Sequence, residues 1–420
     1  MNILILGGGG REHALAWAVM QNPKCDKLIV APGNAGIAKI ATCAAFDIED
    51  SAAVIEFAQN ESVDFVIIGP EAPLAAGVSD DLINAGFLVF GPSKEAAQLE
   101  ASKAFTKEIC DAANAATAGY GHFTDAESAK AYILKNGAPI VVKADGLAAG
   151  KGVVVAMDLD EALAAVDDMF GGAFGGAGAE VVIEEFMEGE EASFFVLCDG
   201  INVLPIGTAQ DHKRVGEGDT GPNTGGMGAY SPAPVLTEAI AERALDEIVK
   251  PCMAEMARRG TPYQGVLYAG LMIKDGAPRL VEYNARFGDP ECQVLMMRLG
   301  GQILDLLLAT AEESLADAQV NWANDHAMTV VMAANGYPSA YENGSVINGL
   351  DALSDDSFNV VFHAGTAKKD GQTIAAGGRV LNVTSRGGSL ADAHQRAYAA
   401  VDSIEWPEGF FRRDIGWRAL

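Results

Sequence analysis

Short, mainly apolar runs alternate with helix-like stretches over the first hundred residues. Four such runs end near glycine or proline, at residues 2–6, 27–30, 65–68 and 87–90. Residues 12–20, between the first two runs, have the spacing of a helix. Fully apolar strands separated by helices are typical of a parallel sheet that is covered on both faces. The pattern therefore predicts a doubly wound parallel sheet, which binds ligands beyond the carboxyl ends of its strands.

The pattern changes after the first hundred residues. Two strand-like runs, at 139–143 and 153–157, flank the glycine-rich residues 144–152. A helix-like stretch at 160–169 and a strand-like run at 181–185 follow. Strands joined by so short a connection pair antiparallel, so a small α+β unit is predicted here.

A larger mixed unit follows, and a polar break near residues 321–325 precedes a final strand-rich segment. Strand-like runs near 193–198 and 266–273 belong to the larger unit. We therefore expect an N-terminal α/β domain at 1–101, a small lobe with a glycine-rich loop at 102–192, a large lobe at 193–320 and a C-terminal domain at 325–420.

Composition narrows the function classes. Asp and Glu number 57 against 29 Lys and Arg, which gives a formal charge of −28. A charge this negative repels nucleic-acid backbones and anionic membranes, so neither is expected as a partner. No apolar run approaches the roughly 18 residues of a membrane span, and no signal peptide is visible. The six cysteines are scattered without a CxxC pair, so we expect reduced thiols in a cytoplasmic protein.

A glycine turn at residues 7–10 follows the first strand and opens a helix, which is the setting of a dinucleotide-binding fingerprint. The third glycine of that fingerprint is absent, because Glu12 and His13 stand where it would fall. A helix N-terminus still favours an anion, so Gly10 and Arg11 are candidates for holding a single phosphate. The alternative is a tight turn with Arg11 in a surface ion pair.

The loop 144–152 superficially resembles a P-loop, but it is one residue short and joins two strands. Gly152 also stands where the hydroxyl residue that holds magnesium would be. The amides of a glycine-rich loop can nevertheless cover a triphosphate, and Lys143 can add a positive charge. The alternative is a flexible hairpin with solvated lysines.

An acidic turn follows the strand-like run at 181–185, with five glutamates among residues 184–191. Backbone groups at such a strand end can bind an adenine edge, and a carboxylate can bind ribose hydroxyls. A solvated acidic turn is the alternative.

Residues 280–291 combine a strand with several polar groups. Alternate residues on a strand share a face, so Glu282, Asn284 and Arg286 are expected to project together. A carboxylate and an amide oxygen suit Mg²⁺, which completes its shell with water and substrate phosphates. Arg286 suits a substrate carboxylate or phosphate. The alternative is an exposed Glu–Arg pair on an ordinary strand.

Together these segments resemble the ATP-grasp ligases and, within them, the phosphoribosylamine–glycine ligase family. The similar blocks run from end to end: GGGGREHALAW (7–17), APGNAG (31–36), GPEAPL (69–74), KADGLAAGKGV (143–153), EEFMEGEEAS (184–193), QDHKRVGEGDTGPNTGGMGAYSP (210–232), EYNARFGDPE (282–291) and FRRDIGWRA (411–419). The resemblance implies an enzyme of de novo purine synthesis. Such an enzyme joins glycine to 5-phosphoribosylamine with ATP and forms glycinamide ribonucleotide, ADP and phosphate through glycyl phosphate.

The resemblance also implies where ATP binds, with the loop 144–152 closing over the phosphates. The implied ATP-binding residues are Lys103, Lys143, Gly146, Gly150, Lys151, Gly152, Glu184, Glu185, Phe186, Met187 and Glu191. Residues 184–187 would line the adenine site, and Glu191 would hold the ribose. Glu282 and Asn284 would ligate Mg²⁺ or Mn²⁺, although the preceding strand carries no acid to complete the metal shell.

Roles for the two other substrates follow from the same resemblance. Arg286 is the candidate for the glycine carboxylate. The substrate-binding candidates are Gly10, Arg11, Glu71, Arg286 and Arg379, and the catalytic candidates are Arg286, Lys143, Asp211 and Lys213.

The expected partners are therefore the small molecules glycine, 5-phosphoribosylamine and ATP. We expect a monomer, with a dimer as the alternative. Another ATP-grasp enzyme, such as a carboxylase subunit or a formate-using purine ligase, is disfavoured by the glycine-specific blocks. A nucleotide-binding module without catalysis is disfavoured by the intact Lys143, Glu282 and Asn284, and a dinucleotide oxidoreductase by the missing third glycine.

Overall fold

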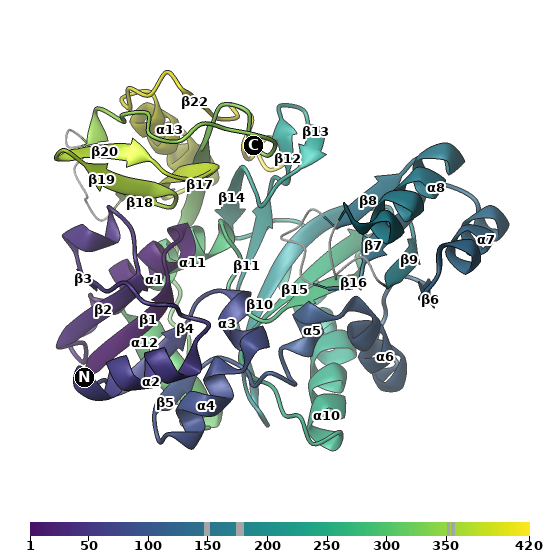
Figure 1. Ribbon diagram of the computed structural model, residues 1–420, viewed down its shortest axis with the longest axis horizontal. Helices are drawn as coiled ribbons and strands as arrows, with labels where there is room; N and C mark the ends of the chain where they lie inside the picture. The colour runs from purple at the N-terminus through teal and green to yellow at the C-terminus, as the bar shows by residue number, and fades with distance from the viewer. Residues whose placement is uncertain (147–151, 174–179, 351–352, 354–357) are drawn as a thin grey trace.

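The computed structural model describes residues 1–146, 152–173, 180–350, 353 and 358–420. Figure 1 shows a long central sheet with three groups of elements around it. The N-terminal elements lie at the lower left, a small lobe extends to the right, and the C-terminal elements lie at the top. Gly150 and Lys151, two of the predicted ATP-binding residues, fall outside the described residues.

The N-terminal sheet has five parallel strands in the order β3-β2-β1-β4-β5. Its elements are β1 (Asn2–Gly7), α1 (Gly10–Val19), β2 (Lys27–Pro32), β3 (Thr42–Cys43), α2 (Ser51–Asn60), β4 (Phe65–Ile68), α3 (Glu71–Ala76), α4 (Val78–Asn84) and β5 (Leu88–Phe90). Ile3 to Leu6 in β1 are fully buried because both faces of the sheet are covered. This confirms the predicted doubly wound parallel sheet.

The small lobe is a four-stranded sheet in the order β6-β9-β7-β8, with every pairing antiparallel. Its elements are β6 (Tyr120–Phe123), α7 (Ala126–Asn136), β7 (Ile140–Ala144), β8 (Val153–Ala156), α8 (Leu159–Asp168) and β9 (Val181–Glu185). Two helices, α5 (Gln98–Ala101) and α6 (Lys103–Ala113), connect the N-terminal sheet to this lobe. The predicted antiparallel pairing of the strands that flank the glycine-rich loop is confirmed.

The large sheet follows the path β16-β15-β10-β11-β14-β17-β21-β18, and β22 pairs with β17. Its strands are β10 (Glu190–Asp199), β11 (Val203–Asp211), β14 (Gly228–Ser231), β15 (Gln264–Lys274), β16 (Ala277–Asn284), β17 (His326–Ala334), β18 (Asn359–His363), β21 (Arg379–Gly387) and β22 (Gly409–Phe410). The sheet continues through the β14–β17 pairing across the predicted boundary near residue 320. The four-domain division therefore stays a prediction about folding units.

The remaining elements pack on or beside the large sheet. They are the hairpin β12 (Arg214–Gly216) and β13 (Thr220–Asn223), the helices α9 (Glu238–Ala244), α10 (Lys250–Arg258), α11 (Glu291–Leu299) and α12 (Gln302–Ala311), the hairpin β19 (Thr366–Lys369) and β20 (Gln372–Ala375), and α13 (Leu390–Val401). No single helix in the described part of the chain has the length and apolar composition to cross a membrane. Only the pair α11 and α12, bent by 107°, passes that test together.

Two hydrophobic clusters join the N-terminal sheet to the large sheet. Leu4 and Leu6 share one cluster with Phe194 and Leu280, whereas residues on the opposite face of β1 share the other with β10, α11 and α12. Because buried apolar contacts of this extent fix the two sheets relative to each other, the carboxyl end of β1 is held near the end of β16. This junction positions the candidate site.

Candidate active site

A cavity of about 320 Å³ lies where the N-terminal sheet, α6, the small lobe and β16 meet. The predicted residues that line it are Arg11, Glu71, Lys103, Lys143, Gly146, Gly152, Glu184, Asp211, Lys213, Glu282, Asn284, Arg286 and Arg379. Seven basic and seven acidic side chains are among its described lining residues. The lining is thus electrically balanced in a chain of net charge −28, so this region can accept an anion that the rest of the surface repels.

Glu184 lies between two lysines at the wall of the cavity. Its carboxylate is 3.1 Å from Lys107 Nζ and 2.8 Å from Lys143 Nζ. Lys107 Nζ also donates to Thr117 Oγ1 at 2.8 Å. Burial lowers the pKa of Lys107, while the Glu184 carboxylate acts in the opposite direction. The arrangement can present positive charge to a triphosphate from two different elements, α6 and β7.

Lys103 begins α6 and faces the same cavity. The Asp145 carboxylate accepts hydrogen bonds from the backbone amides of Lys103 and Ala104 and from Ser102 Oγ. Lys103 Nζ donates to the carbonyl of Gly146 at 3.2 Å. The start of the glycine-rich loop is therefore tied to the N-terminus of α6 by Asp145, an acid at the helix end where a negative charge is stabilising.

Glu282 and Asn284 lie on one face of β16, as the strand period predicts. A register shift in the β15–β16 pairing leaves Val281 without a partner and turns both Val281 and Glu282 to the cavity. No described group donates a hydrogen bond to the Glu282 carboxylate. Burial opposes its ionisation, but Lys213, Lys143, Lys103 and Arg286 outweigh burial and lower the pKa of Glu282. An ionised carboxylate with free oxygens beside an amide oxygen fits a hard divalent cation.

Arg286 follows on the same face and is held by acids. Its guanidinium is 3.0 Å from Glu100 and 3.4 Å from Glu71, and it donates to Asn284 Oδ1 at 3.2 Å. These carboxylates raise the pKa of Arg286 despite the opposing effect of burial. Burial raises the pKa of Glu100 in turn. A permanently charged guanidinium at the cavity wall suits a substrate carboxylate.

Asp211 and Lys213 reach the cavity from the end of β11. Lys213 Nζ forms an ion pair with Glu191, the predicted ribose ligand. Burial, with Glu291 and Glu191 nearby, raises the pKa of Asp211 to about 7 although Lys213 opposes the shift. A carboxyl group with a pKa near neutrality can both accept and return a proton at the pH of the cell.

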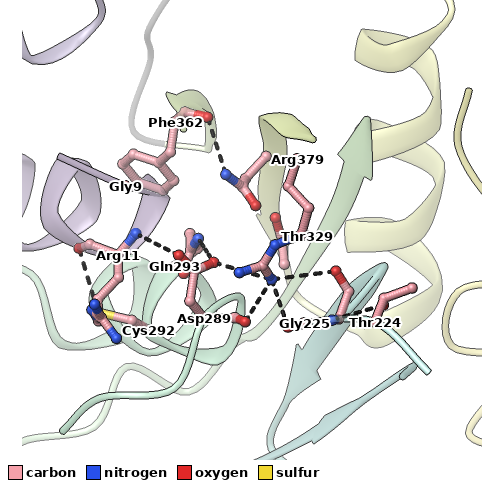
Figure 2. Close-up of polar contacts among 12 residues, drawn as sticks. Gly9, Arg11, Thr224, Gly225, Asp289, Cys292, Gln293, Thr329, Phe362 and Arg379 are labelled. Carbon is pink, nitrogen blue, oxygen red and sulfur yellow. Dashed lines mark hydrogen bonds and ion pairs between the residues drawn. The ribbon is translucent and has the colours of Figure 1, made fainter. Parts of the chain in front are cut away.

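Asp289 joins three parts of the chain at one corner of the cavity, as Figure 2 shows. Its carboxylate accepts from the backbone N–H of Arg11 at 3.3 Å and from Gln293 Nε2 at 2.9 Å. Arg379 donates to the carbonyls of Asp289 and Gly225 at 2.7 and 2.6 Å. The backbone amide of Arg11 near the start of α1 and the guanidinium of Arg379 on β21 therefore meet at Asp289.

Family models match this chain along most of its length. The models for the N domain, the ATP-grasp (A) domain and the C domain of phosphoribosylglycinamide synthetase match residues 1–100, 101–292 and 327–418. The chain belongs to the phosphoribosylglycinamide synthetase family. This membership confirms the resemblance found in the sequence and the predicted ATP-grasp fold.

Curated relatives of the synthetase family agree over the whole chain. The phosphoribosylamine–glycine ligase of Mesorhizobium japonicum is 59% identical over 420 residues, which cover 100% of this chain and 99% of the relative. The chloroplastic phosphoribosylamine–glycine ligase of Arabidopsis thaliana is 56% identical over 418 residues, which cover 98% of this chain and 79% of the relative.

Solved structures agree with the synthetase fold. The phosphoribosylamine–glycine ligase of Thermotoga maritima has a TM-score of 0.87 at 32% identity and covers 99% of this chain and 100% of its own. The biotin carboxylase domain of Hydrogenobacter thermophilus 2-oxoglutarate carboxylase, solved with MgADP and bicarbonate, has a TM-score of 0.74 at 15% identity, covering 98% and 91%. This second likeness shows a shared fold alone.

Five described residues of the predicted site lie outside the cavity lining, namely Glu185, Phe186, Met187, Glu191 and Gly10. Glu185 forms an ion pair with Arg279 and accepts from the Gly119 amide, while Met187 is buried and Phe186 is half-buried. Gly10 lies beneath the cavity wall, where a Cβ atom would be 2.3 Å from Asn382 Nδ2. A glycine therefore suits this position because Asn382 approaches it closely, and Gly10 does not line the cavity.

Sequence reasoning missed several lining residues of the synthetase cavity. Lys107 was not predicted, although it follows Lys103 by four residues on α6, a spacing that puts both on the same face of a helix. Asp289 and Glu291 lie in the block 282–291 that we matched to the family, but neither of these two acids was given a role. Glu100 offered no sequence signal, because its contact with Arg286 joins residues far apart in the chain.

Proposed function

We propose that this chain ligates glycine to 5-phosphoribosylamine with the conversion of ATP to ADP and phosphate, and forms glycinamide ribonucleotide for de novo purine synthesis. The observation that carries the proposal is the 59% identity to a phosphoribosylamine–glycine ligase over 100% of this chain. The charge-balanced cavity supports it, since the reaction needs one site for a triphosphate, a carboxylate and a sugar phosphate.

In this proposal ATP lies between the small lobe and β16. Lys103 and Lys143 contact the phosphates, together with the amides of the loop that contains Gly146, Gly150, Lys151 and Gly152. Residues 184–187 line the adenine site and Glu191 holds the ribose. The finding in favour is that Lys103 and Lys143 enter one cavity from α6 and β7.

Glu282 and Asn284 are proposed to hold Mg²⁺, with Mn²⁺ as the alternative ion. The unpartnered, ionised Glu282 carboxylate beside an amide oxygen fits either ion. When bound, the ion neutralises charge that develops on the phosphates.

Arg286 is proposed to orient the glycine carboxylate toward the γ-phosphate. A carboxylate oxygen attacks phosphorus, the bond to the ADP oxygen breaks, and glycyl phosphate forms. The amine of phosphoribosylamine then attacks the acyl carbon, and the bond to the phosphate oxygen breaks. We assign the amine proton to Asp211, whose pKa of about 7 suits it as a base. Lys213 keeps positive charge beside the departing phosphate.

Phosphoribosylamine is proposed to bind at the N-terminal side of the cavity. Arg11 and Arg379 both line the cavity and supply charge for its phosphate, and the helix N-terminus at Gly10 favours an anion. Glu71 is assigned to the part of the cavity that would hold the amine end of phosphoribosylamine. We further propose a monomer, with a dimer as the alternative, that acts in the cytoplasm on these small molecules without a nucleic-acid or membrane partner.

Labelled glycine tests the reaction. Glycine carrying oxygen-18 in its carboxylate should deliver one labelled oxygen to the released phosphate, because that oxygen bridges carbon and phosphorus in glycyl phosphate. ADP and phosphate should form only when glycine, phosphoribosylamine and metal–ATP are all present. Phosphate without the label, or ADP formation that is independent of glycine, would refute the proposed ligation.

The metal assignment is tested by Glu282→Gln. We expect turnover to fall by on the order of 10²–10³-fold or more, because the metal loses its charged ligand. The unfolding midpoint should not change, since the described structure gives the Glu282 carboxylate no hydrogen-bond donor. Glu188→Gln is the control, because Glu188 is exposed and, within the described part of the chain, forms an ion pair only with the exposed Lys274. Wild-type turnover in Glu282→Gln would contradict the metal assignment.

A further inference from the structure

The C-terminal segment of the sequence, residues 411–419, has no role in the proposed reaction. None of its residues lines the cavity. Arg412 in this segment is only 1% exposed. Burying a guanidinium costs free energy unless its N–H groups are hydrogen-bonded. The hydrogen-bond partners of Arg412 therefore indicate its structural role.

Arg412 holds two segments together. Its Nε and Nη2 donate to the two carboxylate oxygens of Asp414, each at 2.8 Å. Its Nη1 donates to the carbonyl of Arg214 at 2.9 Å and to Asp219 Oδ1 at 3.0 Å. Asp414 in turn accepts from the backbone amide of Gly218 at 2.8 Å. A planar fork makes all of these bonds at once, which a lysine cannot do.

His212 is the second attachment of the C-terminal segment. It is 1% exposed, and its Nε2 accepts a hydrogen bond from the backbone amide of Gly416 at 2.9 Å. Because Nε2 accepts, the neutral ring carries its proton on Nδ1, which is 3.6 Å from Asp219. The side chain of His212 therefore points to the C-terminal segment, while its neighbours Asp211 and Lys213 line the cavity.

The held backbone continues into the cavity wall. The carbonyl of Lys213 accepts from the backbone amide of Thr224 at 2.7 Å and from Thr224 Oγ1 at 2.8 Å. The carbonyl of the next residue, Gly225, accepts a hydrogen bond from Arg379 Nη1 at 2.6 Å. Thus the hairpin β12–β13 is fixed by Arg412 on one side and carries cavity residues at both of its ends.

We propose that Arg412, paired with Asp414, is a positioning residue that sets Asp211 and Lys213 for the chemical step. The role rests on the proposed ligase function. It differs from general stabilisation because the hairpin β12–β13 is fixed to the C-terminal segment, whereas Lys103 and Lys143 are carried by α6 and β7. Loosening the hairpin should therefore affect catalysis more than ATP binding.

The test compares two adjacent ion pairs on the same segment. Arg412→Lys and Asp414→Asn weaken the buried pair, whereas Arg413→Lys and Asp402→Asn change the neighbouring pair, which is 2.6 Å apart and about half exposed at both partners. For each purified full-length variant, kcat with glycine, phosphoribosylamine and metal–ATP, the Kd for ATP alone and the unfolding midpoint are measured. All assays are run well below the unfolding midpoint.

Arg412→Lys and Asp414→Asn should lower kcat by about 10- to 100-fold, since a displacement of about 1 Å can cost this much. The Kd for ATP should stay within about threefold of the wild-type value, and both control variants should keep wild-type kcat. Unchanged kcat in the two test variants, or a loss equal to that of the controls, would overturn the positioning role. A wild-type chain without glycine-dependent turnover would instead refute the proposed ligase function.

Discussion

At the scale of single residues, one buried carboxylate pairs with two buried lysines beside the cavity. Glu184, Lys107 and Lys143 have side chains that are at most 4% exposed, and both oxygens of Glu184 are used. Removing charges from water costs free energy that close pairing offsets. Without Glu184 both lysines would lose this ion pair, and burial, which lowers the pKa of Lys107, would be less opposed. Glu184 therefore balances positive charge from two elements at the cavity wall.

Glu184→Gln is expected to destabilise the fold strongly. Breaking a buried pair leaves an uncompensated charge and typically costs about 3–5 kcal/mol of unfolding free energy. Glu185→Gln is the matched control, since Glu185 is an exposed neighbour paired with Arg279 and should lose less than about 1 kcal/mol. Urea unfolding of both variants measures the difference. Equal losses would contradict the special role of Glu184.

Strand alternation predicted some of the site residues, whereas other features of the site had no local signal in the sequence. Glu282, Asn284 and Arg286, which strand alternation predicted to project together, all line the cavity, although Val281 and Tyr283 line it as well. The alternation along β16 did not reveal that the pairing with β15 shifts at Val281, because a bulge depends on the partner strand and not on local composition. For the same reason the contact of Glu100 with Arg286 had no local signal.

At the scale of elements, the start of α6 is coupled to the glycine-rich loop through Asp145. Two backbone amides of the helix and Ser102 Oγ donate to this single carboxylate. An acid at a helix N-terminus satisfies amides that have no partner within the helix. Since Lys103 lies at this helix end, Asp145 should influence ATP binding as well as helix stability.

Asp145→Ala is expected to lower the unfolding free energy by about 1–2 kcal/mol and also to weaken ATP binding. Asp125→Ala is the control, because Asp125 caps α7 through the Ser128 amide at 2.8 Å and does not line the cavity. The control should lose about 1 kcal/mol with an unchanged Kd for ATP. Calorimetric titration with ATP separates the two variants. A Kd that is the same in both would contradict the coupling of the loop to α6.

The elements themselves were more predictable than their association. Apolar runs predicted β1, β4 and β9 because each is a buried strand with a clear boundary at glycine, proline or an acidic turn. No pattern in the sequence indicated that strands of the large lobe and of the C-terminal domain form one sheet. Its β14–β17 pairing joins Tyr230 to Met328, and hydrogen bonds between such distant residues are not encoded in either strand's own pattern.

At the scale of the whole molecule, elements from the N-terminal and C-terminal parts of the chain both contact Asp289 in its central part. The N-terminal α1 and the C-terminal β21 contribute Arg11 and Arg379 to the corner at Asp289. Gly10 allows this closure, because any side chain there would collide with Asn382 and Gln293. The parallel N-terminal sheet thus supplies a helix end, and the C-terminal strands supply the basic side chain that faces it (Figure 2).

A second contact between the same two ends involves two buried histidines. His13 on α1 accepts a hydrogen bond through Nδ1 from the backbone amide of His363 on β18 at 2.8 Å, and the two rings are 5.7 Å apart. Burial and the neighbouring His363 lower the pKa of His13 to about 3. Burial, with Lys39 and Lys368 nearby, lowers the pKa of His363 to about 4. Both rings are therefore neutral where this interface is intact.

The interface should make the protein sensitive to mild acid. The unfolded chain binds protons on these histidines below about pH 6.5, whereas the folded chain does not until about pH 4, so unfolding free energy is lost as the pH falls through this window. Each histidine should lower the unfolding free energy by about 1 kcal/mol between pH ~7.5 and pH ~5.5.

His13→Asn keeps an acceptor and removes the titration, so its unfolding midpoint should fall less between these pH values than that of the wild type. His122→Gln, a change on the small lobe far from α1, should keep the full wild-type decrease. If His13→Asn loses as much stability as the wild type over the same pH interval, the acid sensitivity arises from other groups.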